Sequence, residues 1–154
     1  MQFVFNDLGG VGVGTQARAA FERAAAIWSA LLNDPITIRL DVQFSALGPN
    51  ILGSTGSTTN TVAYNTVRQA LIADATSVFD QAAVASLAPG PLTFVSNEPP
   101  AAGAIDSRTR FLDNNNTTDN NNLNVNTAQM KALGLTPVYA AGNTTQRDGS
   151  ISFS

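Results

Sequence analysis

The chain has 154 residues, the size of one domain, and a net charge of −3 with only 12% of its residues charged. It has no basic cluster, so it lacks the concentration of Lys and Arg that a nucleic-acid partner requires. The absence of Cys excludes disulfides and thiolate chemistry, and the absence of His excludes imidazole ligands and serine–histidine or cysteine–histidine catalysis.

The first predicted elements are a short strand at Gln2–Phe5 and a helix from about Gln16 to Leu32. Apolar residues recur along the helix in steps of three and four, which is typical of a helix that buries one face. Phe21 and Trp28 are the large members of that stripe. We therefore expect these two side chains to supply most of the area that the helix buries.

A glycine-rich link at residues 8–14 joins the strand to the helix. Gly9 and Gly14 have the spacing of a P-loop, but Thr15 stands where the P-loop lysine should follow. The dinucleotide fingerprint also fails, because no glycine occupies position 15. A plain flexible connection, with Thr15 as the helix N-cap, is the better interpretation, and a nucleotide site is the alternative.

The stretch Pro35–Leu47 predicts the central strand of the fold. Its apolar residues alternate with polar residues without a break, the period that a strand needs to bury one face. The apolar members are Ile36, Ile38, Leu40, Val42 and Phe44. Because such a strand needs a cover for its apolar face, we expect Phe21 and Trp28 to pack on it.

The middle of the chain predicts a second helical region between two irregular segments. The first segment is a loop rich in Gly, Ser and Thr at residues 48–61, and the helical region runs from about Asn65 to Leu87. A short strand at Leu92–Val95, an irregular link at residues 96–105 and a weaker segment at Ser107–Leu112 follow.

The Asn-rich run at residues 113–126 is predicted to be a solvated loop. Oxygen-bearing side chains occupy alternate positions in it, as in a calcium loop: Asp113, Asn115, Thr117 and Asp119. The sixth position lacks the turn glycine and the twelfth lacks the bidentate glutamate. Weak calcium binding is therefore the alternative interpretation.

The end of the chain predicts a short helix at residues 128–133, closed by Gly134, and a strand at Ser150–Ser154. Ile151 and Phe153 show the period of two and are expected to face the core of the same sheet as the central strand. We expect this last strand to be an exposed edge, so that the chain is either marginally stable or pairs edge to edge with a second copy. We also expect the chain to be a fragment of a longer protein.

Together the elements predict an α+β fold, with a twisted mixed sheet and two main helices packed on it. Several segments then resemble a known group of proteins: a helix ending in A-A-I-W, the strand D-P-I-T-I-R-L-D-V-Q-F, and L-G-S-T. The resemblance continues through Tyr64–Ser77, Lys131–Leu135 and Asp148–Phe153. These segments resemble the N-terminal part of secreted bacterial zinc metallopeptidases of the zincin-like, PEP-CTERM-associated type.

The resemblance implies that a helix bearing His-Glu-x-x-His follows in the full-length parent, where zinc and its bound water hydrolyse a peptide or protein substrate. No catalytic, cofactor-binding or metal-ligating residue carries over to residues 1–154. The chain is then expected to be the non-catalytic N-terminal portion of a secreted or cell-surface endopeptidase. Residues 150–154 are expected near the cleft where a peptide pairs as an added strand.

Other functions remain open at this point. The low charge, the abundant Asn and Thr and the unpaired last strand would also suit an extracellular structural or filament-forming module. A carbohydrate-binding module would need exposed aromatic side chains close together, and a carboxylate-only hydrolase would need paired carboxylates. No run of residues approaches the roughly 20 apolar positions of a membrane span.

Overall fold

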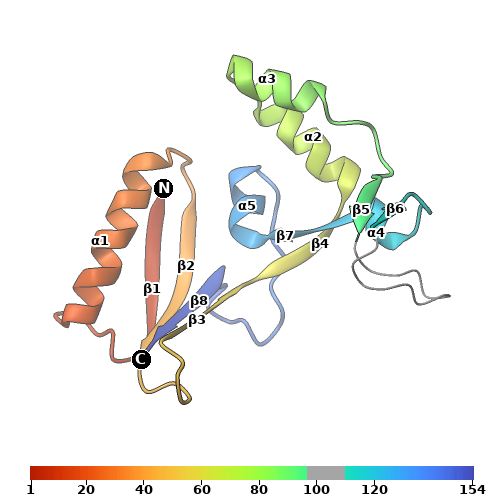
Figure 1. The fold of residues 1–154 in the computed structure, drawn as a ribbon. Coiled ribbons are helices and arrows are strands. Elements are labelled where there is room, and N and C mark those ends of the chain that lie inside the picture. The colour runs from red at the N-terminus through yellow and green to blue at the C-terminus, as the bar shows by residue number, and fades with distance from the viewer. Residues whose placement is uncertain (97–109) are drawn as a thin grey trace. The chain divides into compact units, whose positions relative to one another are not determined.

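The computed structural model describes residues 1–96 and 110–154, and the link predicted at residues 96–105 lies almost entirely outside them. The chain divides into two compact units, here called unit 1 (Met1–Asn60 with Val125–Ser154) and unit 2 (Thr61–Asn124). Helices and strands are mixed along the chain, so the predicted α+β class is confirmed (Figure 1). None of the helices in the described ranges has the length and apolarity that a membrane crossing requires.

Unit 1 is built on a four-stranded mixed sheet in the order β1-β2-β8-β3. Its strands are β1 (Gln2–Gly9), β2 (Thr37–Phe44), β3 (Gly53–Ser57) and β8 (Gly149–Phe153). The strands β1, β2 and β8 run parallel, whereas β3 pairs with β8 in the antiparallel direction.

The last strand joins the sheet as predicted, but the expectation that it forms an edge was wrong. Strand β8 lies between β2 and β3, and the outer strands are β1 and β3. Strand β3 falls in the segment 48–61 that was predicted to be a loop. Its sequence, GSTGS, has no apolar side chain and therefore no hydrophobic alternation to reveal a strand.

Helix α1 (Gln16–Leu31) connects β1 to β2 and covers one face of these strands (Figure 1). Thr15 caps it as predicted, since its Oγ1 accepts a hydrogen bond from the backbone N–H of Arg18 (3.1 Å). Beneath the helix lies the core of Val11, Phe21 and Val42, against which Phe5, Ala17, Leu40 and Ile151 pack.

Trp28 does not belong to this core, so its predicted role was wrong. Trp28 is 55% exposed, whereas Phe21 is 9% exposed. Trp28 lies two turns beyond Phe21, roughly 10 Å further along the helix axis. There it lines an open groove of about 410 Å³ with Phe3 and Ile38 instead of a closed interior.

The second helix of unit 1 is α5 (Thr127–Ala132), close to its predicted bounds. Leu133 is its C-cap, and Gly134 follows in the C′ position with a φ of +67°, the left-handed conformation that a C′ glycine supplies. The N–H of Leu135 donates to the carbonyl oxygen of Met130 (2.8 Å) and satisfies one of the last helical carbonyls.

Unit 2 contains two helices where a single helical region was predicted. They are α2 (Tyr64–Asp74) and α3 (Val78–Ala85). The break comes at Ser77, which forms a capping box with Asp80 and starts a new helix. The short strands β5 (Phe94–Ser96) and β6 (Phe111–Asp113) pair antiparallel. Strand β5 overlaps the strand predicted at Leu92–Val95, and no conformation was predicted for the segment Ser107–Leu112 that precedes the end of β6.

The Asn-rich run is not a solvated loop throughout, because it contains α4 (Thr118–Asn121) and β7 (Asn122–Asn126). Strand β7 pairs with β4 (Thr59–Ala63), and the boundary between the two units falls within both strands. Asn120 is fully buried. Its amide nitrogen donates to the carbonyl oxygen of Leu92 (2.8 Å), so this asparagine fills a structural position.

Tyr64 gives a test of the packing in unit 2. Its hydroxyl group is part-buried and donates to the carbonyl oxygen of Ala88 (2.7 Å). Tyr64→Phe removes the donor and leaves that carbonyl unpaired, so the stability of α2 should fall by about 1 kcal/mol. Hydrogen exchange of the α2 amides measures the change, and unchanged protection would contradict the assigned bond.

Candidate functional site

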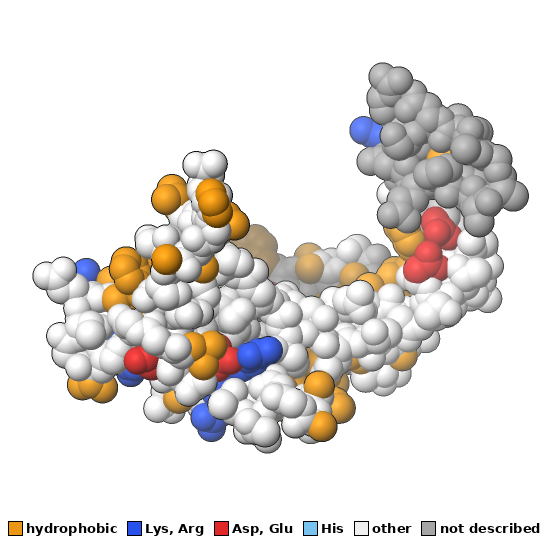
Figure 2. All heavy atoms as spheres, turned by 90° about the horizontal axis from the view of Figure 1, so that it is seen from below, with side chains coloured by type: hydrophobic (Ala, Val, Ile, Leu, Met, Phe, Trp, Pro, Cys, Tyr) orange, Lys and Arg blue, Asp and Glu red, His pale blue; other side chains and the backbone are white. Residues whose placement is uncertain are grey.

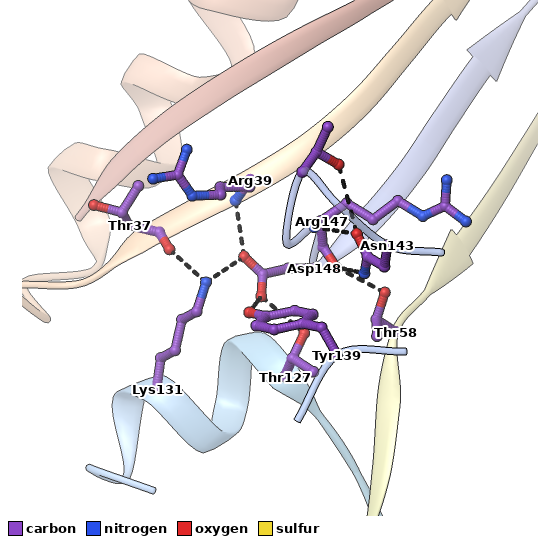
Figure 3. A network of polar contacts seen from close by, with 10 residues as sticks. Thr37, Arg39, Thr58, Thr127, Lys131, Tyr139, Asn143, Arg147 and Asp148 are labelled. Carbon is purple, nitrogen blue, oxygen red and sulfur yellow. Dashed lines mark hydrogen bonds and ion pairs between the residues drawn. The ribbon is translucent and has the colours of Figure 1, made fainter. Parts of the chain in front are cut away.

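A cluster of polar side chains in unit 1 surrounds the carboxylate of Asp148, whose side chain is 1% exposed (Figure 3). One oxygen accepts hydrogen bonds from the backbone N–H of Arg39 (2.8 Å) and from Nζ of Lys131 (2.7 Å). The other accepts from the hydroxyl groups of Thr127 (2.8 Å) and Tyr139 (2.8 Å). Four donors thus converge on one buried carboxylate.

This carboxylate is charged at neutral pH. Burial alone raises the pKa of Asp148, but the hydrogen bonds from Lys131, from the Arg39 backbone, from Thr127 and from Tyr139 outweigh it and hold the pKa below its usual value. Lys131 also donates to the carbonyl oxygen of Thr37 (3.0 Å). Because its lone pairs are already occupied, Asp148 is poorly suited to act as a general base.

The backbone of Asp148, just before β8, forms hydrogen bonds on both sides, to β2 and to the residue after β3. Its N–H donates to the carbonyl oxygen of Arg39 in β2 (2.7 Å), and its own carbonyl accepts from the N–H of Thr58, next to β3 (2.8 Å). The side chain adds α5 through Thr127 and Lys131. Asp148 therefore fixes β8 in its place, and β8 in turn holds the outer strand β3.

In the described part of unit 1, the outer edge of strand β3 pairs with no other strand. The N–H of Ser154 donates to the carbonyl oxygen of Leu52 (3.1 Å), so Leu52 directs its backbone groups toward β8. The backbone direction alternates along a strand, so Ser54 and Gly56 also direct their N–H and C=O groups toward β8. In an antiparallel pair the intervening residues point their backbone groups away from the partner strand. Gly53, Thr55 and Ser57 therefore direct N–H and C=O groups outward, and all five residues of β3 are exposed.

The backbone of the glycine-rich link is hydrogen-bonded to a carboxylate. One oxygen of Asp7 accepts from the N–H groups of Gly9 (2.8 Å) and Val11 (3.0 Å). These are backbone donors of the kind that a phosphate would need. Gly10 is required for a different reason, since a Cβ atom there would collide with the carbonyl oxygen of Phe44.

The residues of this chain do not fit a zinc centre of the metallopeptidase type. The sequence has neither His nor Cys, and residues 1–96 and 110–154 contain no group of three or more His, Cys, Asp or Glu side chains suited to a metal. In the calcium-like run, the hydroxyl group of Thr117 bonds to the side chains of Asn115 and Asp119, and calcium binding there stays a prediction.

Sequence reasoning included Asp148 only in a segment of the family resemblance and missed its structural role. One signal was available: Lys131 is the single lysine of the chain, and a partly buried ammonium group needs an acidic partner. Nothing in the sequence indicated which acidic residue that is.

Comparisons with protein-family models, with curated proteins and with solved structures found no match to this chain. They bear neither for nor against the resemblance to zinc metallopeptidases.

Proposed function

We propose that residues 1–154 form the non-catalytic N-terminal sheet of a secreted zinc-dependent endopeptidase and hold its peptide substrate in an extended conformation. The observation that carries the proposal is the exposed outer strand β3, in which Gly53, Thr55 and Ser57 direct their backbone groups away from β8. Such an edge accepts an extended peptide as an added strand.

The composition of β3 supports this use. Its side chains are limited to Gly, Ser and Thr, so no long side chain stands between a peptide and the backbone groups of the edge. Hydrogen bonds between main chains give affinity with little specificity for the peptide's sequence, which suits an endopeptidase that acts on many sites. The strand is held rigid from behind, because Asp148 fixes β8 to both β2 and the Thr58 segment.

Hydrolysis in this proposal depends on groups outside residues 1–154, since the chain lacks the ligands that zinc prefers. In the parent protein a bound zinc ion would activate water for attack on the peptide bond. The part assigned to the present residues is limited to binding and orienting the substrate.

Thr55→Pro tests the edge. The N–H of Thr55 points outward, so proline removes a donor for a peptide without removing a hydrogen bond to β8, and edge strands tolerate it. An unstructured peptide of roughly six residues, the length of a strand, should shift the backbone amide resonances of β3 in the native chain and fail to shift them in Thr55→Pro.

Thr55→Ala is the matched control, because it keeps the N–H and removes the side chain. It should bind the peptide as the native chain does. Equal binding by the proline variant, or peptide-induced shifts confined to residues outside β3, would refute the edge as the binding site.

An extracellular structural module is the second candidate, and a specific observation favours it. Both outer strands of the sheet, β1 and β3, have a free edge in the described part of unit 1, so copies could pair edge to edge. Sedimentation across a wide concentration range separates the two functions. A mass that grows with concentration favours the structural module, and a constant monomer mass favours the peptide-binding edge.

A further inference from the structure

A second surface of unit 1 lies on the sheet face opposite α1. Phe5 and Leu40 pack beneath α1, so their neighbours Asn6, Arg39 and Asp41 project from the other face, as the period of a strand requires. These side chains and Val4 line a cleft of about 440 Å³, which residues 144–146 close on one side. The volume is in the range of small-molecule sites.

The acidic group in this cleft is already neutralised. Asp41 is 4% exposed, and its two oxygens accept from Nδ2 of Asn6 (2.9 Å) and from the guanidinium group of Arg147 (2.8 Å). A buried carboxylate with a cationic partner contributes no net charge to the cleft.

Arg39, by contrast, has an uncompensated charge. Its backbone bonds to Asp148, but its guanidinium group has no hydrogen-bond or ion-pair partner among the residues that the structure describes. Figure 3 shows its side chain extending away from Asp148. The hydroxyl group of Thr144, in the wall of the cleft, is likewise unpaired within the described chain. Charged side chains are sparse on the face drawn in Figure 2, consistent with the low charged fraction of the chain.

We propose that this cleft binds a small organic carboxylate, which Arg39 holds through its two-pronged guanidinium group and Thr144 through its hydroxyl group. A planar carboxylate matches the fork of an arginine. One free cation is too little to neutralise a phosphate dianion. The cleft floor includes the apolar Val4, so the ligand carries a body of several carbon atoms beside its charged end.

The test is a titration of the whole chain, followed through its amide resonances at constant ionic strength. The probes are N-acetylvaline, glucuronate, inorganic phosphate and the uncharged methyl ester of N-acetylvaline. We expect saturable shifts at Arg39 and at residues 144–146 with at least one of the two organic carboxylates, and none with the ester. Preference for N-acetylvaline indicates a peptide-type ligand, and preference for glucuronate a sugar acid.

Arg39→Gln should weaken carboxylate binding about tenfold or more, the usual effect of losing a charge-assisted hydrogen bond. Arg23→Gln is the control, because Arg23 is an exposed arginine of α1 and its loss changes the net charge equally. Thr144→Val removes only the wall hydroxyl group and should also weaken binding, which keeps the test valid if Arg39→Gln fails to fold.

Tighter binding of phosphate than of both carboxylates, equal binding of the ester, or equal losses in Arg39→Gln and Arg23→Gln would each overturn the proposal. So would the absence of any saturable shift at residues 144–146. None of these results bears on the proposed function. The cleft lies over β1 and β2, whereas the β3 edge lies at the opposite end of the sheet and is tested with a peptide.

Discussion

Asp148→Ala is expected to lower the free energy of unfolding of unit 1 by about 3–5 kcal/mol, the usual cost of breaking a buried ion pair by removing one partner. The substitution leaves Lys131, whose side chain is 20% exposed, without its carboxylate. It also leaves the hydroxyl groups of Thr127 and Tyr139 without an acceptor. Chemical denaturation followed by the fluorescence of Trp28, the single tryptophan, measures the change.

Asp74→Ala is the matched control, since Asp74 is an exposed aspartate at the end of α2. It should change stability by less than about 0.5 kcal/mol. Similar effects of the two substitutions would mean that the four donors around Asp148 do not stabilise the fold.

The same carboxylate predicts how stability depends on pH. The pKa of Asp148 is lower in the folded chain than its usual value, so its stabilising contribution is complete above that usual value, about 3.9, and is lost as the pH falls through the folded pKa. The native chain should therefore lose stability below about pH 4. Asp148→Ala should lose less over the same interval, because the group that takes up the proton is gone.

Phe21→Ala is expected to cost about 3–5 kcal/mol, the usual range for removing a buried aromatic side chain. The ring of Phe21 lies 5.7 Å from that of Phe5 and 5.9 Å from that of Phe153, so its loss opens a cavity between α1, β1 and β8. Denaturant midpoints of the variant and the native chain measure the effect.

Trp28→Ala serves as the comparison, because Trp28 lies on the same helix face but remains about half exposed. It should cost roughly 1–2 kcal/mol, since much of its apolar surface already contacts water. A larger loss from Trp28→Ala than from Phe21→Ala would contradict the placement of the core beneath the first turns of α1.

The sequence predicts the interior of the sheet and α1 well, because hydrophobic periodicity records burial directly. The alternation from Ile36 to Phe44 marks β2, and Ile151 with Phe153 marks β8. Strand β3 could not be found in this way. It is an exposed edge strand of Gly, Ser and Thr that is held in the sheet by backbone hydrogen bonds. Its sequence therefore has no hydrophobic alternation from which a strand could be predicted.

The candidate site was less predictable still, because it depends on contacts between distant segments. Asp148 and Arg39 are 109 positions apart, and Asp148 meets Thr127 and Lys131 only once β8 enters the sheet. In the sequence, Asp148 before the alternation of residues 149–153 cannot be distinguished from an ordinary turn aspartate. The cleft at Arg39 is hidden for the same reason, since residues 144–146 reach it only in the folded chain.

The proposed function is tested most directly by determining the reading frame that encodes these residues beyond the codon for Ser154. The proposal predicts that the frame continues into a helix bearing His-Glu-x-x-His, since it assigns only substrate binding to the present residues, and they include neither His nor Cys to hold zinc. A frame that stops after Ser154, or one that continues without such a histidine pair, would contradict it and leave the extracellular structural module as the better account.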